Sequence, residues 1–422
     1  MALFVQKFGG SSVATPDRIR AVAEIVRRTR QAGHQVVVVV SAMGDSTDHL
    51  IDLAHQIHAE PNDREMDLLL STGEQVSVAL LAMALHARGE PAVALTGPQA
   101  GIFTDPVHTK AKILHVRPRR IKENLRRGRI VVVAGFQGET AGEDIATLGR
   151  GGSDTTAVAL ATALQADRCQ FYKDVTGVFT ADPRVVPEAR QIPEISYDEM
   201  LELAGAGSEV LQSRAVEFAK KYGVVLEVLS SFEEKPGTLV KEEVSDMEGI
   251  LVRGIAVDKK QAKLTMIHLP DRPGIAAGIF RRLAEAHVNV DMIVQNEGEA
   301  DYTDLSFTVP KVDLERSRKI LAMVLKETGA TELRTDERIA KISLVGVGMR
   351  SHSGVAYRMF EALAAQGVNI EMISTSEIKI SVVIDETLAD TATRALHQAF
   401  ALGRKAPAPK PPAPRKRSRP RS

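Results

Sequence analysis

Two glycines beside a lysine near the start of the chain could hold a phosphate. Lys7 opens the segment KFGGSS, in which Phe8 is followed by Gly9 and Gly10, directly after a short strand-like run over 3–6. Glycines let the backbone approach a ligand closely, and successive N–H groups at a helix N-terminus attract anions. Lys7 would add a mobile positive charge. A tight strand-to-helix turn with a surface lysine explains this segment about equally well, because short motifs often match by chance.

Two further segments carry groups that suit a phosphate or an amino acid. Residues 41–47, SAMGDST, follow a valine run, and Ser41 could bind an anion there; helix capping by Ser46 or Thr47 is the simpler interpretation. Gly73 lies inside a helical pattern, which indicates a kink or a close backbone approach. The adjacent Glu74 could pair with a substrate ammonium, although a solvated glutamate explains it in isolation.

An arginine among three glycines, in the segment LGRGGSDTT over 148–156, stands at the start of an apolar helix. Arg150 can bind a carboxylate in a bidentate manner, and Ser153 and Asp154 stand where helix N–H groups face outward. A flexible loop in which Asp154 only caps the helix is a weaker interpretation, because capping requires neither Arg150 nor three glycines. Residues 172–184 mix charge with turn residues after a strand, which suits a nucleotide or a long surface loop.

The elements that must position these segments alternate between strand and helix. Apolar β-branched runs predict strands covered on both faces at 35–41, 130–134 and 168–172. Helical periodicity predicts helices over 16–30, 63–88 and 154–165. This alternation predicts a mostly parallel sheet in a three-layer α/β/α domain, in which ligands lie beyond the carboxyl ends of the strands.

The composition excludes several classes of protein. The chain has 422 residues, 44% hydrophobic and 26% charged, which is typical of a soluble globular protein with two or three domains. Cys169 is the only cysteine, so intrachain disulfides and CxxC sites are excluded. Aromatic residues make up 4%, which argues against base stacking. No apolar run reaches about 18 residues and no signal peptide is visible, so we expect a cytoplasmic protein that binds neither membrane nor nucleic acid.

The net charge of zero conceals a basic tail. Residues 404–422 hold eight Lys and Arg, no acidic residue and six of the 19 prolines, which leaves 46 basic residues against 54 acidic ones elsewhere. A segment of this kind cannot bury a core, so we expect it to be disordered. A polybasic tail can bind nucleic acid, but a solvated appendage is the favoured interpretation.

The second half of the chain contains an internal repeat. Residues 262–296 and 340–376 align as AKLTMI with AKISLV, PGIAAGIFRRLAEA with SGVAYRMFEALAAQ, and VNVDMI with VNIEMI. Each copy, with the strand and helix that follow, predicts a βαββαβ unit with helices on one face of an antiparallel sheet.

These motifs, taken in order, resemble the aspartate kinases of the amino acid kinase family. KFGGSS, SAMGDST, STGE, TLGRGGSDTTA and FTADPR occur in the order that the family uses, and the repeat resembles its paired ACT domains. The resemblance implies an amino-acid-kinase domain over 1–245, ferredoxin-like ACT domains over 246–336 and 337–403, and a tail over 404–422. It implies transfer of phosphate from ATP, with Mg²⁺, to the β-carboxylate of L-aspartate, the entry step to lysine, threonine and methionine synthesis.

The resemblance also assigns roles to residues. Lys7 and Asp154 would flank the transferring phosphoryl group, Arg150 would bind the aspartate α-carboxylate, Glu74 its ammonium, and Thr47 and Ser153 would orient the β-carboxylate. ATP contacts are implied for Lys7, Phe8, Gly9, Gly10, Ser41, Lys173, Asp174, Phe179, Asp182, Arg184 and Glu209. No protein-held metal site is implied. Glu209 stands where the family usually has lysine, which puts a side-chain role there in doubt and suggests weaker ATP affinity.

For the repeats, the resemblance implies feedback inhibitors, lysine or threonine or both, bound between ACT units and across subunits. The implied residues are Asp271, Gly274, Ala276 and Gln295 in one repeat and Asn369 and Ile370 in the other. Ser353 replaces the expected proline in the second copy, so that loop is expected to be less suited to a ligand. Scaffold-only dimerisation modules remain an alternative. Paired units imply at least a homodimer, and Met247 lies where an internal start could give a separate regulatory chain.

Two rival functions stay open at this point. An amino-acid-sensing protein with an inactive kinase domain would share the fold, although the presence of Lys7, Glu74, Arg150 and Asp154 argues against it. A sibling kinase acting on glutamate or a nucleotide would share the phosphate segments, whereas the pairing of Arg150 with Glu74 favours an α-amino acid.

Overall fold

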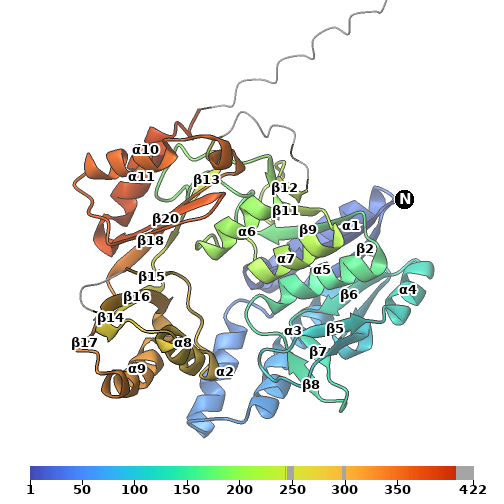
Figure 1. Cartoon of the computed structure of the whole chain (residues 1–422). Coiled ribbons are helices and arrows are strands. Elements are labelled where there is room, and N and C mark those ends of the chain that lie inside the picture. The colour runs from blue at the N-terminus through green and yellow to red at the C-terminus, as the bar shows by residue number, and fades with distance from the viewer. Residues whose placement is uncertain (243, 245–250, 297–300, 405–422) are drawn as a thin grey trace, which may run out of the picture.

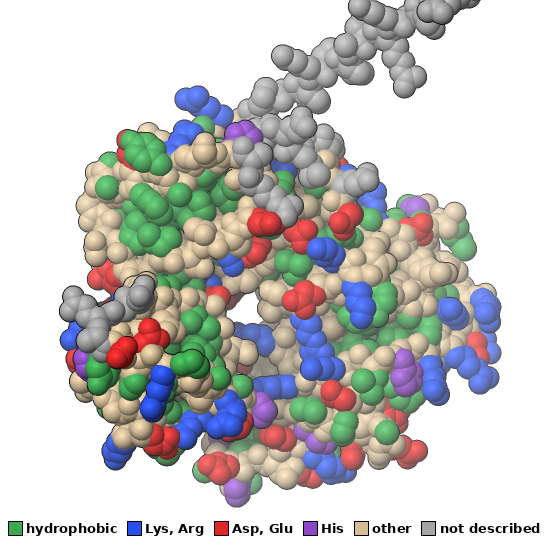
Figure 2. All heavy atoms as spheres, viewed as in Figure 1, with side chains coloured by type: hydrophobic (Ala, Val, Ile, Leu, Met, Phe, Trp, Pro, Cys, Tyr) green, Lys and Arg blue, Asp and Glu red, His purple; other side chains and the backbone are tan. Residues whose placement is uncertain are grey.

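The protein consists of a large N-terminal α/β part and two smaller four-stranded sheets (Figure 1). The computed structural model describes residues 1–242, 244, 251–296 and 301–404. The predicted basic tail, apart from Arg404, and Met247 lie outside these residues. Figure 2 shows an opening, bordered by Lys and Arg side chains, between the lower of the small sheets and the N-terminal part.

An eight-stranded sheet forms the centre of the N-terminal part. Its strand order is β10-β12-β11-β9-β1-β2-β6-β3, and every neighbouring pair is parallel except β11 with β12. The strands are β1 (Leu3–Phe8), β2 (Gln35–Val40), β3 (Ala92–Leu95), β6 (Ile130–Ala134), β9 (Arg168–Lys173), β10 (Glu194–Ser196), β11 (Leu226–Ser230) and β12 (Thr238–Lys241). The valines of β2 from Val36 to Val40 are fully buried, which confirms a strand covered on both faces.

Helices cover both faces of this sheet. Val38 packs in a cluster with α1 (Pro16–Gln31) and α3 (Asp63–His86), whereas its neighbour Val39 packs with the helices of the other face. Those helices are α4 (Arg119–Arg126), α5 (Gly152–Leu164), α6 (Tyr197–Gly205) and α7 (Ser213–Tyr222). Because successive side chains of a strand point to opposite faces, the valine run joins the three layers, and the predicted α/β/α fold is confirmed.

Helix α3 is long and apolar enough to pass a membrane-span criterion, with a mean hydropathy of 1.6 over its best window. Polar and charged residues interrupt its apolar ones, so the helix contains no continuous apolar run of about 18 residues. Half of that window is buried inside the protein, where Val78, Leu81 and Leu85 pack on the central sheet. A core helix of this kind meets the same criterion.

A second sheet of short strands, which the sequence did not predict, lies beside α3. Its order is β5-β4-β7-β8, from β4 (Ile102–Thr104), β5 (Ile113–Val116), β7 (Gln137–Glu139) and β8 (Ile145–Thr147). Strands of three or four residues are too short to show an alternating pattern. The loop 105–112 and the glycine-rich segment 148–151 both leave this sheet.

The first repeat has the predicted βαββαβ order. It comprises β14 (Gln261–Pro270), α8 (Ile275–Glu285), β15 (Ile293–Gln295), β16 (Tyr302–Pro310), α9 (Leu314–Thr328) and β17 (Glu332–Asp336), in the sheet order β15-β16-β14-β17. All pairs are antiparallel.

The second repeat departs from the predicted unit in one strand. Its own elements are β18 (Ile339–Val345), α10 (Val355–Ala364), β19 (Met372–Thr375), β20 (Lys379–Asp385) and α11 (Ala389–Ala399). The fourth strand of its sheet is β13 (Gly254–Asp258), which precedes the first repeat in the chain and pairs antiparallel with β18. Strand periodicity indicates a strand at this point but not which sheet it joins. The predicted domain ranges remain a prediction. Strand β13 lies inside the range predicted for the first ACT domain, but it belongs to the sheet of the second repeat.

The two repeats contact each other along β15 and β19. Lys263 of the first forms an ion pair with Glu371 of the second, and Lys341 of the second with Asp291 of the first. In the aligned repeats Lys263 corresponds to Lys341 and Asp291 to Glu371. Apolar side chains pack between the repeats at Met292, Ile339, Met372 and Val383. The repeats therefore meet through reciprocal contacts, as the halves of a two-fold symmetric interface do.

Candidate active site

Three charged side chains lie together at the carboxyl ends of β1 and β9. Asp154 accepts from both lysines: its Oδ1 is 2.6 Å from Lys7 Nζ, and its Oδ2 is 3.1 Å from Lys173 Nζ. Burial by itself raises the pKa of Asp154, but the two lysines outweigh it and hold the pKa at about 2. Burial lowers the pKa of Lys7, and Asp154 opposes that shift. Two ammonium groups around one carboxylate leave one positive charge for an anion.

The glycine segment lies beside this cluster and against the end of β2. A Cβ on Gly9 would lie 3.7 Å from Lys7 Nζ, and one on Gly10 would lie 2.9 Å from the carbonyl oxygen of Ala42. The N–H of Gly44 donates to the carbonyl of Gly10 at 3.1 Å. The segments after β1 and β2 thus form one surface, with Ser41 half-buried at its edge. This is the strand edge at which parallel sheets bind ligands.

Glu74 reaches the same surface from α3. Its Oε1 accepts from the N–H of Ala42 at 3.1 Å, whereas its Oε2 is buried and has no hydrogen-bond partner within the described part of the chain. Burial raises its pKa to about 7, against the opposing effect of the Ala42 N–H and of Lys7. Gly73 permits the contact, because a Cβ there would lie 2.9 Å from the Cβ of Ala42. The predicted close approach is confirmed, and α3 continues through Gly73.

The segment around Arg150 depends on glycines in the left-handed region. Gly149 and Gly151 have φ of 73° and 72°, and Gly151 precedes the first turn of α5. Ser153 and Asp154 lie at the start of this helix, as predicted. Both are buried, and Asp154 pairs with lysines instead of capping the helix. Arg150 is exposed, and no hydrogen bond or ion pair holds its side chain in the described residues.

Thr47 is half-buried in the first turn of α2 (Ser46–Ile57). Helix capping by Ser46 or Thr47, the simpler interpretation of this segment, was wrong. The N-cap position is Asp45, and the hydroxyl of Ser46 donates to the carbonyl of Met43. Ser46 and Thr47 therefore lie inside the helix and do not cap it. A cavity of about 570 Å³ lies next to Thr47, between α2 and α3, and is lined by Ala14, Met43, Gly44, His49, Leu50 and Gly73 among others.

The predicted nucleotide residues after β9 include an ion-paired arginine. Arg184 forms an ion pair with Asp182 at 2.7 Å. This pairing raises the pKa of Arg184, and the charges of Asp174 and Glu209 act in the same direction. Phe179 is half-buried and forms an isolated β-bridge with Gln191.

Glu209 points its carboxylate toward the repeats. It forms an exposed ion pair with Lys260, in the connection between β13 and β14. Its backbone segment is packed there as well, because a Cβ on Gly207 would lie 2.5 Å from the carbonyl oxygen of Val257. The expectation that Glu209 contributes little at the nucleotide through its side chain stays a prediction.

The residues predicted to bind inhibitors lie in both repeats. Gly274, with φ of 95°, precedes α8, with Asp271 before it and Ala276 in the first turn. Gln295 ends β15, and Asn369 and Ile370 precede β19. These are the two strands along which the repeats meet, and the predicted inhibitor site stays a prediction.

Sequence reasoning missed two features of this region. Lys173 was predicted only as an ATP contact, and its ion pair with Asp154 requires knowing that β9 lies next to β1. Asp67, fully buried in α3, went unnoticed because nothing in its local sequence distinguishes it from a surface carboxylate. Among the described residues, no group of three or more His, Cys, Asp or Glu side chains is placed to hold a metal ion.

Comparison with known families defines the class of protein. The profile of the amino acid kinase family matches residues 2–230, and profiles of ACT domains match residues 263–322 and 342–400. The fold and the lysine–glycine site therefore define a kinase domain followed by two ACT domains.

Individual relatives show which branch of the amino acid kinase family the chain is similar to. The aspartokinase of Pseudomonas aeruginosa is 57% identical over 404 residues, which cover 95% of this chain and 98% of that protein. The crystal structure of E. coli aspartokinase III with aspartate and ADP, termed the R-state, has a TM-score of 0.80 at 26% identity and covers 94% of this chain and 99% of that chain. Its T-state structure with lysine and aspartate has a TM-score of 0.74, with the same identity and coverage. The chain belongs to the aspartokinases of the amino acid kinase family, and it is an enzyme.

Proposed function

We propose that this enzyme transfers the γ-phosphoryl group of ATP to the β-carboxylate of L-aspartate, giving 4-phospho-L-aspartate and ADP. The observation that carries the proposal is the Lys7–Asp154–Lys173 cluster, in which Lys7 and Asp154 are buried and which lies beside a glycine segment. Glu74 reaches the same surface, and its Oε2 has no hydrogen-bond partner within the described part of the chain. E. coli aspartokinase III, which shares the fold, was solved with aspartate and ADP.

Lys7 and the glycine segment act on the phosphate. A carboxylate oxygen of aspartate forms the new P–O bond while the bond from phosphorus to the bridging oxygen of ADP breaks, and ADP keeps the electron pair. Lys7 neutralises the charge that builds on the phosphoryl oxygens, and the N–H groups of Gly9 and Gly10 bind them. Asp154, ionised because its pKa is about 2, holds Lys7 and Lys173 in place. The nucleophile is ionised near pH 7, so no general base is required.

Glu74 and Arg150 recognise the amino acid. The buried Oε2 of Glu74 lacks a partner in the described residues, and an α-ammonium would satisfy it. The guanidinium of Arg150, which makes no hydrogen bond or ion pair among the described residues, would bind the α-carboxylate through two parallel hydrogen bonds. Thr47 and Ser153 orient the β-carboxylate toward phosphorus. These contacts use the two charges that every α-amino acid carries and leave the side chain for reaction.

The nucleotide lies along the segments after β1, β2 and β9. Phe8, Ser41, Asp174, Phe179, Asp182, Arg184 and the backbone near Glu209 form this side of the site. Mg²⁺ bound together with ATP would supply further positive charge, which would reduce the negative charge that Lys7 has to neutralise. Asp174 is an exposed carboxylate in this region and would be available to hold such an ion.

The reaction opens the synthesis of lysine, threonine and methionine in the cytoplasm. The ACT repeats make the enzyme sensitive to lysine, threonine or both, bound where the repeats meet and where subunits associate through them. E. coli aspartokinase III was solved with lysine in its T-state, which supports this assignment of the repeats.

A coupled ADP-release assay tests the proposal. Purified protein with ATP and Mg²⁺ should release ADP only when L-aspartate is present, and hydroxylamine should trap the acyl phosphate as a hydroxamate. Folded protein without turnover would indicate a sensor, and turnover with glutamate in place of aspartate would indicate a sibling kinase. Repeating the assay with lysine, threonine and both together identifies the inhibitors.

A further inference from the structure

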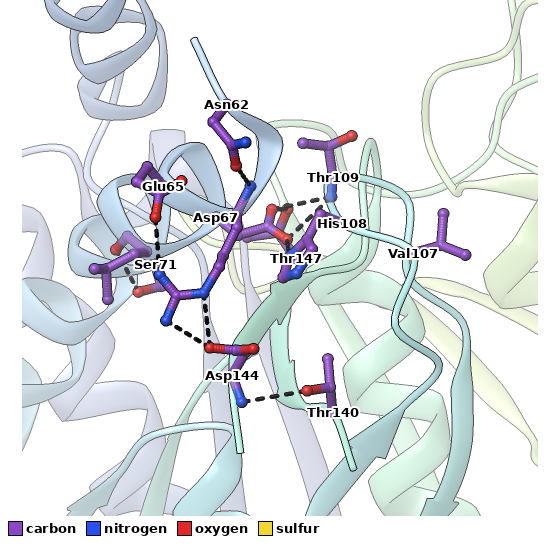
Figure 3. A network of polar contacts seen from close by, with 12 residues as sticks. Asn62, Glu65, Asp67, Ser71, Val107, His108, Thr109, Thr140, Asp144 and Thr147 are labelled. Atoms are coloured by element: carbon purple, nitrogen blue, oxygen red, sulfur yellow. Dashed lines mark hydrogen bonds and ion pairs between the residues drawn. The ribbon is translucent and has the colours of Figure 1, made fainter. Parts of the chain in front are cut away.

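Asp67 of α3 lies in a network of polar contacts with His108, Thr109 and Thr147 (Figure 3). Its carboxylate is fully buried in α3 and accepts from the N–H of Thr109 at 3.0 and 3.1 Å, from Nδ1 of His108 at 2.7 Å, and from the hydroxyl of Thr147. Three donors from two separate segments therefore converge on one side chain. A carboxylate suits this position because it only accepts hydrogen bonds, whereas an amide would turn an NH₂ group toward a donor.

The first of these segments is the loop 105–112. Thr109 has φ of 62°, a region that β-branched residues rarely adopt, and the bonds from its N–H to Asp67 hold it there. The carbonyl oxygen of Thr109 lies so close to Gly149 that a Cβ on that glycine would be 3.0 Å away. The residue after Gly149 is Arg150, so the loop supports the backbone from which Arg150 projects.

The second segment ends β8 and leads into Arg150. The hydroxyl of Thr147 donates to Asp67, and its carbonyl accepts from the N–H of Ala111 at 2.9 Å. Arg214 of α7 joins the same two segments, because its guanidinium donates to the carbonyls of Leu148 and Ala111, both at 2.9 Å. The chain on the N-terminal side of Arg150 is thus fixed at each residue from Thr147 to Gly149.

Asp67 and Glu74 belong to the same face of one helix. They are seven residues apart, which is two turns, so their Cα atoms are separated by about 10 Å along the axis. Glu74 lies at the surface proposed to bind the substrate ammonium, whereas Asp67 holds the segments that carry Arg150. Helix α3 thereby sets the spacing between the proposed ammonium site and the proposed carboxylate site.

We propose that Asp67 is a positioning residue for Arg150 and that it sets the affinity for the α-carboxylate of the amino acid substrate. The proposal rests on the proposed role of Arg150 as the carboxylate clamp. Asp67 touches neither substrate nor phosphate, and it acts through Thr109 and Thr147.

Steady-state kinetics of Asp67→Asn in the full-length enzyme test the proposal. The aspartate KM should rise about 10- to 100-fold, because a bidentate contact is lost when its geometry shifts by about an ångström, while kcat and the ATP KM stay within about twofold. Asp63→Asn, the same change at an exposed position of the same helix, is the matched control and should behave as wild type. A role in stability alone would lower the active fraction, and hence kcat, without moving the aspartate KM.

A double-mutant cycle with Arg150→Ala gives the decisive result. If Asp67 acts only through Arg150, Asp67→Asn should change the aspartate KM less than about twofold once Arg150 is already removed. Additive effects would overturn the proposal, as would an aspartate KM that is unchanged in folded Asp67→Asn or that rises equally with the ATP KM.

Thr147 provides a milder test if Asp67→Asn fails to fold. Thr147→Val keeps the volume but removes the hydroxyl, and should raise the aspartate KM about three- to tenfold, while Thr147→Ser should stay within about twofold. Equal values for the two variants would refute the proposal. A wild-type enzyme without aspartate-dependent turnover would instead refute the proposed function, and a normal Arg150→Ala would refute the clamp.

Discussion

The amino-acid side and the nucleotide side of the site rest on different parts of the molecule. Glu74 and the segment of Arg150 are held by α3 and the small sheet, within the kinase domain. The nucleotide segment 179–186 is packed into the second repeat instead: Ala181 and Val186 belong to its apolar core, and the hydroxyl of Thr180 lies 3.0 Å from Nε2 of His397 in α11. Within the described residues, the second repeat is thus in direct contact with the proposed nucleotide segment, whereas Glu74 and the segment of Arg150 are held by elements of the kinase domain.

Helix α6 adds to this asymmetry. Its buried Glu199 pairs with Arg253 at 3.3 Å and accepts from the N–H of Val347, and Glu202 pairs with Lys379 at 2.8 Å. The helix then leads into the segment that contains Gly207 and Glu209. On the proposed nucleotide side, the segment 179–186 is thus packed on the second repeat, and the segment of Gly207 and Glu209 follows a helix fixed to that repeat. If the proposed function holds, substrate recognition and regulation through the repeats should be separable in this fold, and the following changes test that expectation.

Lys7→Ala should have the largest effect, because the proposed role of Lys7 is to neutralise the phosphate that both sides share. We expect kcat to fall about 100- to 1000-fold, the loss typical of one oxyanion-stabilising group. Circular dichroism and thermal unfolding should confirm that the variant is folded. A kcat near that of wild type would show that the phosphoryl group lies elsewhere.

Arg150→Ala should affect only the amino-acid side. Loss of a bidentate charge-assisted contact should raise the aspartate KM about 10- to 100-fold and leave the ATP KM unchanged. Initial rates with each substrate varied in turn measure both constants. The separation of the two sides is wrong if both constants rise together.

The pH dependence of the aspartate KM should report Glu74. Burial raises its pKa to about 7, so in the free enzyme it becomes protonated as the pH falls through 7, and the neutral acid cannot pair with an ammonium. We expect the aspartate KM to be about tenfold higher at pH 6 than at pH 8. Glu74→Gln should abolish this dependence, and a dependence that survives in that variant would assign it to another group.

His397→Leu should weaken ATP binding without touching the amino-acid side. It removes the bond to Thr180 that ties the nucleotide segment to α11, so we expect the ATP KM to rise about three- to tenfold. His397→Gln, which keeps a side-chain N–H, is the matched control. An aspartate KM that rises as much as the ATP KM would show that the contact with α11 does not act on the nucleotide side alone.

Deletion of residues 405–422 should have the smallest effect. We expect both KM values and kcat to stay within about twofold, because a basic, proline-rich segment buries no core. Kinetics of the truncated enzyme at low and moderate ionic strength measure this. A tenfold change in any constant would give the tail a role in catalysis.

The sequence predicted the parts of this structure that depend on local pattern. The valine run of β2, the glycine turns at Gly10 and Gly149, and the start of α5 near Ser153 each follow from the chemistry of neighbouring residues. The parts that failed depend on which distant segments meet. Asp67 looks like any surface carboxylate until the loop at Thr109 packs on it, and Lys173 joins Asp154 only because β9 lies next to β1.

The placement of β13 has a consequence for how the chain reaches its native state. Asp258 pairs with Lys341, so this strand emerges from the ribosome roughly 80 residues before its partner and must wait for it. The intervening repeat has only local connections and can form first, which shortens the loop that β13 must close. Ile255, which is buried in the finished sheet, is exposed during that interval. The slowest step in maturation of the regulatory half is therefore expected to be the docking of this one strand.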